Sequence, residues 1–236
     1  MAALLGKRGR GWFHPYGPRL LRCNVVQQYV VVLLLAFIAF SRPAAAEAVD
    51  IVAFGDSLTA GYGLAQNESF PAQLEAALRE KGHDVTIRNA GVSGDTTAAG
   101  LERLDWAVPE DVDGVIVELG ANDMLRGLDP ARTRENLDEI LTRLTDRDLP
   151  ILLAGMFAAP NLGQDYGRRF NAIFPELAEE HDTLLYPFFM DGVALNDSLI
   201  QDDGLHPTAD GVAVIVERIL PTVEEFIARI EAARAD

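Results

Sequence analysis

Short apolar runs recur along the chain at intervals typical of buried strands. The first run, at 49–54, is almost entirely apolar, as expected for a parallel strand that is covered on both faces of a sheet. Similar runs occupy 85–90, 112–119, 151–156 and 183–185. The hydrophobic pattern therefore predicts five strands.

Helical patterns separate these runs. Apolar residues recur at helical spacing within 70–78, 137–144 and 212–230, so that each set forms one face of a helix. Asp129 and Pro130 are a typical N-cap and first residue, and they predict that a helix begins there. Strands that alternate with helices predict an α/β fold: a three-layer α/β/α sandwich around a central, mostly parallel five-stranded sheet.

The amino-terminal segment has a different pattern. Residues 1–24 are basic, 30–40 is an uninterrupted apolar run, and the small residues Ala44-Ala45-Ala46 follow. This order predicts a secretory signal peptide at 1–46, cleaved after Ala46 or Ala48, and a single exported domain at 47–236 that is periplasmic or secreted. The alternative is an uncleaved anchor helix, but the stretch 25–40 is shorter than the ~20 residues that usually span a bilayer.

Charge is divided in the same way. Residues 1–46 hold six basic and no acidic side chains, which leaves 14 basic and 36 acidic side chains in 47–236, a net charge of −22. Such a surface excludes nucleic acid as a partner and disfavours stable attachment to an acidic membrane after signal cleavage. The only cysteine, Cys23, lies in the leader, so the mature chain has no cysteine nucleophile and no zinc-thiolate site.

The loops that follow the strands carry the candidate chemistry, because ligands bind at the carboxyl ends of strands in such sheets. Ser57, in Gly55-Asp56-Ser57, follows the first strand and is either an exposed nucleophile or a helix N-cap. Gly94 follows the second strand, and its unobstructed N–H can donate to an oxyanion or simply form a turn before a cap at Asp95 or Thr96. Ser93 is a rival nucleophile.

Two later strand ends add a donor and a base. Asn122 follows the third strand, and its amide is an uncharged donor for an oxyanion or an ordinary turn former. Asp203 and His206 follow the fifth strand, and their spacing lets one loop supply a general base and the carboxylate that orients it. An acidic helix start and a cation site at Asp202 and Asp203 are the alternatives.

These motifs, in this order, closely resemble those of the GDSL, or SGNH, hydrolase family. The resemblance rests on four blocks that span nearly all of the predicted mature chain: Gly55-Asp56-Ser57-Leu58, Gly94, Gly120-Ala121-Asn122-Asp123 and Asp203-Gly204-Leu205-His206. Further stretches are similar to the bacterial periplasmic branch of multifunctional acyl-thioesterases, arylesterases and lysophospholipases: Gly94-Asp95-Thr96, Val117-Glu118-Leu119-Gly120, Tyr166-Gly167-Arg168-Arg169-Phe170-Asn171 and Pro187-Phe188-Phe189-Met190.

The resemblance implies a flavodoxin-like fold and a role for each motif. Ser57 would be the nucleophile, His206 the general base and Asp203 the residue that orients it. The N–H groups of Ser57 and Gly94 and the Asn122 amide would form the oxyanion hole. The reaction would need no metal and no organic cofactor.

Substrate preference is also inferred from the resemblance. It suggests that apolar side chains after Asn122 and along 156–166 wall an acyl pocket, although they can equally be core residues: Met124, Leu125, Leu128, Met156 and Tyr166. The expected substrates are small-molecule aryl and short to medium acyl esters, with acyl thioesters and lysophospholipids as further substrates. A carbohydrate O-acetylesterase and a secreted module that binds acyl chains without cleaving them are the alternatives.

Overall fold

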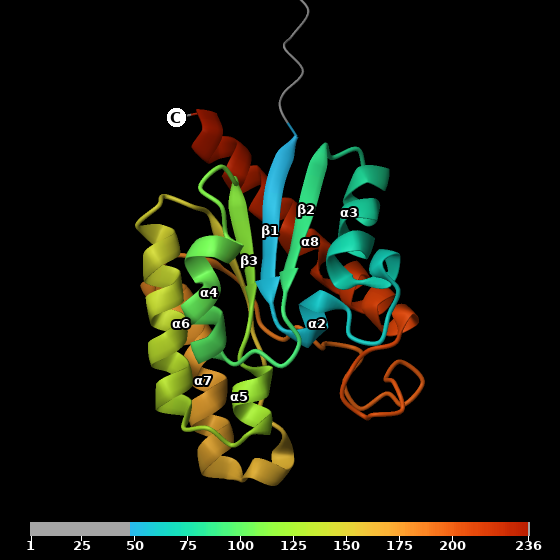
Figure 1. The fold of residues 1–236 in the computed structure, drawn as a ribbon, viewed down its shortest axis with the longest axis vertical. Helices are drawn as coiled ribbons and strands as arrows, with labels where there is room; N and C mark the ends of the chain where they lie inside the picture. Colours follow the sequence, from blue (N-terminus) through green and yellow to red (C-terminus); the bar gives the residue numbers. More distant parts are fainter. Residues whose placement is uncertain (1–47, 236) are drawn as a thin grey trace, which may run out of the picture. The chain divides into compact units, whose positions relative to one another are not determined.

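The computed structural model describes residues 48–235, which form five parallel strands in one sheet (Figure 1). The strand order is β2-β1-β3-β4-β5, and every neighbouring pair is parallel. The bounds are β1 Val49–Gly55, β2 Val85–Gly91, β3 Gly114–Glu118, β4 Ile151–Ala154 and β5 Leu184–Tyr186. The predicted five-stranded parallel sheet is confirmed. The predicted signal peptide lies outside the described residues.

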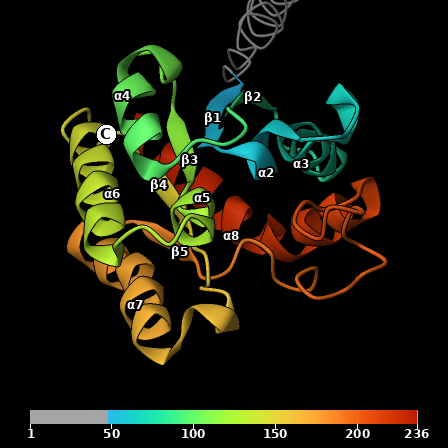
Figure 2. The same ribbon diagram turned by 60° about the horizontal axis from the view of Figure 1, so that its bottom comes forward.

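Helices cover both faces of this sheet. Helices α4, α6 and α7 lie on one side and α3 and α8 on the other, as the two views of Figures 1 and 2 show. The long helices are α3 Phe70–Glu80, α4 Thr97–Ala107, α6 Pro130–Thr145, α7 Gln164–Glu180 and α8 Ala209–Ala235, and the short ones are α2 Ser57–Ala60 and α5 Ala121–Leu125. Short 3-10 turns occur at Gln66–Glu68 and Pro160–Leu162. The predicted three-layer α/β/α architecture is therefore confirmed.

The predicted helix start at Asp129 is also correct. The Asp129 side chain caps α6 by accepting a hydrogen bond from the Ala131 N–H at 3.1 Å, and Pro130 is the first helical residue. Thr96 caps α4 in the same way, through the Ala99 N–H at 3.3 Å. Both caps satisfy N–H groups that have no partner within the helix.

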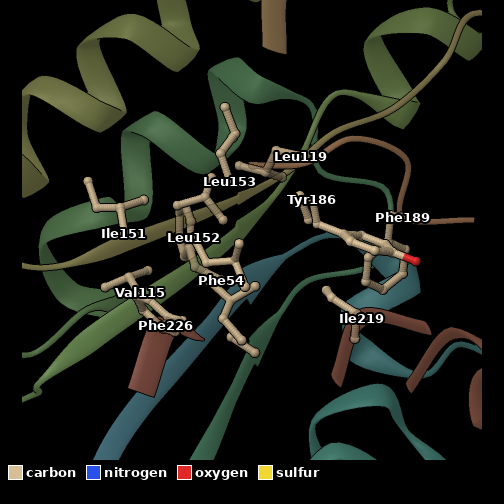
Figure 3. Packing of buried hydrophobic residues seen from close by; sticks show 14 of the residues in the cluster. Phe54, Val115, Leu119, Ile151, Leu152, Leu153, Tyr186, Phe189, Ile219 and Phe226 are labelled. Carbon is tan, nitrogen blue, oxygen red and sulfur yellow. The ribbon is translucent and has the colours of Figure 1, made fainter. Parts of the chain in front are cut away.

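The core fills the space between the sheet and the two helix layers. Figure 3 shows part of this core, including Phe54, Val115 and Leu152 of the strands and Phe226 of α8. All four side chains are fully buried. Truncating a buried phenylalanine such as Phe226 to alanine typically costs about 3 to 5 kcal/mol. This packing fixes the strands and therefore the loops at their carboxyl ends.

Within residues 48–235, no helix combines the length and the hydropathy that crossing a bilayer requires.

Candidate active site

A tight turn holds Ser57 at the end of β1. Asp56 caps the short helix α2 by accepting a hydrogen bond from the Leu58 N–H at 3.0 Å, and Ser57 is the first residue of that helix. Gly55 leaves no room for a side chain, because a Cβ there would lie 2.1 Å from Thr59 Oγ1 and 2.6 Å from the Glu118 carbonyl oxygen. The Ser57 side chain is thereby fixed at the carboxyl edge of the sheet, where it is 8% exposed.

His206 connects Ser57 to a carboxylate. Its Nε2 lies 2.8 Å from Ser57 Oγ, and its Nδ1 lies 2.6 Å from Asp203 Oδ2. The rival serine, Ser93, is exposed, and the other two described histidines, His83 and His181, pair with Glu224 and Asp138 instead. Of the described histidines, His206 alone therefore contacts a serine.

The charge of Asp203 decides the direction of these two hydrogen bonds. Partial burial raises the pKa of Asp203, but hydrogen bonds from the His206 ring and from the His206 and Leu205 N–H groups outweigh it and lower the pKa to about 2. An ionised carboxylate only accepts hydrogen bonds, so Nδ1 of His206 carries the proton. Nε2 is then free to accept from the Ser57 hydroxyl, which is the arrangement a general base requires.

Neighbouring groups hold the His206 loop in place. The Gln201 N–H donates to the His206 carbonyl at 2.7 Å, and the Gln201 amide donates to the Tyr62 carbonyl at 2.8 Å. The Tyr62 ring lies 4.5 Å from the imidazole of His206, centroid to centroid. Tyr62 was not predicted as a site residue. A half-exposed aromatic between Gly61 and Gly63, just after the turn at Ser57, is the sequence signal that could have identified it.

Three hydrogen-bond donors are available for an oxyanion. Within residues 48–235, the backbone N–H groups of Ser57 and Gly94 have no acceptor. Gly94 has a φ of +88°, a conformation that other residues rarely adopt. The third donor is the Asn122 amide, and its Nδ2 uses one hydrogen in a bond of 2.9 Å to Asp56 Oδ2, which leaves the second free.

A buried residue beside Asn122 secures α5. The carboxylate of Asp123 accepts hydrogen bonds from the N–H and the hydroxyl of Thr97, at 2.8 and 2.6 Å, and from the Thr133 hydroxyl at 3.3 Å. Thr97 begins α4 and Thr133 lies in α6. Asp123 thus fixes the helix that carries Asn122 to the two neighbouring helices.

Two buried carboxyl groups lie directly behind the turn at Ser57. Burial raises the pKa of Asp56 to about 6. Burial, together with the nearby negative charge of Asp56, raises the pKa of Glu118 well above its usual range. Glu118 Oε2 accepts from the Thr59 hydroxyl at 2.8 Å, whereas Oε1 has no partner among the described residues. We assign the proton to Glu118, since a neutral acid is the form that a dry site tolerates.

An apolar pocket of about 540 Å³ adjoins these groups, and Ser57, Asn122 and His206 are part of its lining. This volume is in the range of small-molecule sites. Its walls are mainly apolar side chains from the loops after β3, β4 and β5: Met124, Leu125, Met156, Phe157, Phe188, Met190, Leu195 and Leu205.

The pocket includes three of the five expected wall residues, namely Met124, Leu125 and Met156. The other two, Leu128 and Tyr166, do not line it. Tyr166 stacks on Phe170 instead, at 5.9 Å between ring centroids, and Leu128 follows a turn in which Gly127 has a φ of +63°.

The sequence reasoning missed the aromatic wall of the pocket. Phe157 and Phe188 stack at 4.8 Å and both line the pocket. The available signal was the position of both residues in loops that follow strands. Within the described part of the chain, no group of three or more histidine, cysteine or acidic side chains is arranged to hold a metal ion.

Comparison with known proteins decides the family. Residues 53–214 match the model of the GDSL-like lipase/acylhydrolase family. The chain belongs to this family. It is therefore a hydrolase that acts on ester bonds, as its similarity to curated ester hydrolases also indicates.

Individual relatives cover most of the chain. It is 37% identical to an arylesterase of Vibrio mimicus over 199 residues, which is 84% of this chain and 96% of the relative. It is 38% identical to thioesterase 1/protease 1/lysophospholipase L1 of Escherichia coli (strain K12) over 205 residues, 86% of this chain and 96% of that one. The crystal structure of AlinE4, an SGNH-hydrolase family esterase, is 52% identical, covers 77% of this chain and 98% of its own, and has a TM-score of 0.66.

Proposed function

We propose that this GDSL-like hydrolase is a serine esterase that cleaves aryl esters and short to medium acyl esters through an acyl-enzyme. The observation that carries the proposal is the hydrogen-bonded series Ser57–His206–Asp203, which opens onto an apolar pocket. A nucleophile, a base and an orienting carboxylate in this geometry are the parts that nucleophilic acyl transfer requires.

The first half-reaction forms the acyl-enzyme. Ser57 Oγ attacks the carbonyl carbon of the ester, and its proton passes to Nε2 of His206. The electron pair of the carbonyl bond moves to oxygen, and this oxyanion accepts hydrogen bonds from the Ser57 N–H, the Gly94 N–H and the Asn122 amide. When the tetrahedral intermediate collapses, the bond to the leaving group breaks, and the departing alcohol or phenol takes the proton from Nε2.

Water completes the cycle. His206 removes a proton from a water molecule, which attacks the acyl carbon and gives a second oxyanion in the same hole. Collapse then releases the carboxylic acid and returns the proton to Ser57 Oγ. Asp203 stays ionised throughout, because its pKa of about 2 lies far below neutral pH, and it stabilises the imidazolium in both halves.

The pocket supports an acyl chain or aryl ring as the bound group. Its wall consists of methionine, leucine and phenylalanine side chains, and binding there is favourable because it removes apolar substrate surface from water. The names of the relatives agree with this substrate class, since one is an arylesterase and another a thioesterase and lysophospholipase. We include acyl thioesters and lysophospholipids as further substrates on that basis.

A series of p-nitrophenyl esters from acetate to palmitate tests the proposal. We expect turnover of short and medium chains by the wild type and a loss of about 10⁴-fold or more in Ser57→Ala. Ser93→Ala is the matched control and should keep activity close to wild type, because Ser93 is exposed and does not contact His206. Wild-type activity in a folded Ser57→Ala enzyme would refute the esterase proposal.

The same series separates the alternatives. Turnover restricted to acetate, and stronger on acetylated glycans, would replace the proposal by a carbohydrate O-acetylesterase. Binding of acyl chains without turnover of any ester would replace it by an acyl-binding module.

We further propose that residues 1–46 direct export. Amino-terminal sequencing of the protein from the periplasmic fraction should give a chain that starts at Glu47 or Val49.

A further inference from the structure

We propose that Arg103 is a positioning residue for catalysis: its guanidinium joins the strand end that carries the nucleophile to the loop that carries the Gly94 oxyanion donor. The inference rests on the proposed function. Arg103 lies in α4 and is only 6% exposed, although arginine is rarely buried to this extent without partners.

Arg103 makes three hydrogen bonds to three different segments. Nη2 donates to the Gly55 carbonyl at 2.8 Å, Nη1 donates to the Ala90 carbonyl at 2.9 Å, and Nε donates to the Asp95 carboxylate at 2.6 Å. Gly55 ends β1, and Ala90 lies near the end of β2. One rigid, planar group therefore spans both strand ends and the loop beyond β2.

The position of these contacts in the sequence links them to catalysis. Gly55 lies two residues before Ser57, and Asp95 directly follows Gly94. Arg103 also packs on the ring of Phe54, with its Cζ 4.3 Å from the ring centroid, so the guanidinium is fixed on a buried aromatic of β1. We therefore expect a shift of Arg103 to displace Ser57 and the Gly94 N–H relative to each other.

A second arginine holds the same loop from the other side. Arg126, at the end of α5, donates to the Gly94 carbonyl at 2.7 Å. This bond is exposed, whereas the bonds of Arg103 are buried or part-buried, so we expect Arg103 to contribute the larger part of the restraint. The Gly94 peptide is thus held at its carbonyl by Arg126 and one residue further along by Arg103 through Asp95.

Arg103→Lys is the decisive variant, because lysine keeps the charge but cannot span three acceptors in one plane. Arg147→Lys is its matched control. Arg147 also donates to two carbonyls, those of Val108 and Pro109, which lie just beyond the carboxyl end of α4 and away from the site. Both variants are assayed on p-nitrophenyl esters at a temperature where circular dichroism shows that they are folded.

We expect kcat of Arg103→Lys to fall by roughly 10- to 100-fold while KM stays near the wild-type value, because misplaced catalytic groups act on the transition state. The inhibition constant of an alkylboronic acid, which forms a tetrahedral adduct on the serine, should rise by the same factor as kcat/KM falls. Arg147→Lys should lose stability without either change.

The outcomes separate this inference from the proposed function. A folded Arg103→Lys enzyme with wild-type kcat, beside an inactive Ser57→Ala, would overturn the positioning role alone. Activity in Ser57→Ala would overturn the proposed function instead. If Arg103→Lys does not fold, Asp95→Asn serves as the second variant: it leaves Arg103 its two carbonyl acceptors and should lower kcat by a smaller factor, and an unchanged kcat in that variant also overturns the inference.

Discussion

The side-chain amide of Asn122 donates a hydrogen bond of 2.9 Å to the carboxylate of Asp56, the residue that precedes the proposed nucleophile, Ser57. The other carboxylate oxygen of Asp56 caps α2 through the Leu58 N–H. One buried side chain therefore sets both the turn at Ser57 and the orientation of the amide beside it. Replacing one carboxylate oxygen of Asp56 should therefore change the geometry of the proposed oxyanion hole.

Asp56→Asn should lower kcat by roughly 10- to 100-fold with little change in KM. An asparagine has only one acceptor oxygen, so it can serve the Leu58 N–H or the Asn122 amide but not both. A misdirected Asn122 loses part of the stabilisation that an oxyanion-hole donor gives, which is about 10²- to 10³-fold in full. Steady-state kinetics on a p-nitrophenyl ester measures the effect.

The double variant Asp56→Asn/Asn122→Ala provides the control. If Asp56 acts through Asn122, adding Asp56→Asn to Asn122→Ala should cause little further loss of kcat. Losses that multiply would show that the two residues act independently and that Asp56 does not position the amide.

Asp203→Asn should lower kcat by roughly 10³- to 10⁴-fold at neutral pH. The amide cannot fix the proton on Nδ1 of His206 and does not stabilise the imidazolium, so Nε2 is no longer held as the base. Asp202→Asn removes the same charge from the adjacent, exposed position and is expected to retain nearly full activity. Equal losses in the two variants would argue for a general charge effect in place of an orienting role.

The strand ends could be predicted from the sequence because their pattern is local. The run before Ser57 is buried on both faces and the glycines after it interrupt the pattern, so the position of the serine at a strand end follows directly. The parallel topology then brings the carboxyl ends to one edge of the sheet. The contact between Ser57 and His206, 149 residues apart, is a consequence of that topology.

Side-chain direction in the irregular loops could not be predicted. Leu128 and Phe157 are both apolar residues in loops after strands, yet only Phe157 lines the pocket. Arg103 reads as a surface residue of a helix, because its burial depends on carbonyl groups at the ends of two other strands. Such contacts depend on tertiary packing and leave no periodic trace in the sequence.

The pocket predicts a change in chain-length preference for Ala158→Phe. Ala158 lines the pocket beside Phe157, and a phenyl ring there would occupy part of the 540 Å³ volume. We expect kcat/KM for a decanoate ester to fall about 10-fold or more relative to that for acetate, since a few lost methylene contacts have an effect of this order. Ala76→Phe, on the exposed face of α3, is the control. An unchanged ratio of decanoate to acetate would exclude this wall from acyl binding.

The buried pair of Asp56 and Glu118 should make the enzyme less stable as pH rises. Burial raises the pKa of Asp56 to about 6 and that of Glu118 well above its usual range, so the folded state binds more protons than the unfolded state above pH 4. Their contribution to the free energy of unfolding is fully present below pH 4 and is lost as pH rises through the folded pKa values.

Glu118→Gln should relieve the part of this loss that Glu118 causes. Glutamine has the shape of the neutral acid and can still accept a hydrogen bond from Thr59, but it never ionises. We expect urea unfolding to give nearly equal stabilities for variant and wild type at pH 4, and a variant that is more stable by roughly 1 to 3 kcal/mol at pH 8. Glu110→Gln removes a carboxylate from an exposed position and should shift the stability by less than about 0.5 kcal/mol at either pH. A difference between Glu118→Gln and wild type that is the same at pH 4 and pH 8 would mean that the pKa of Glu118 is not raised in the folded enzyme.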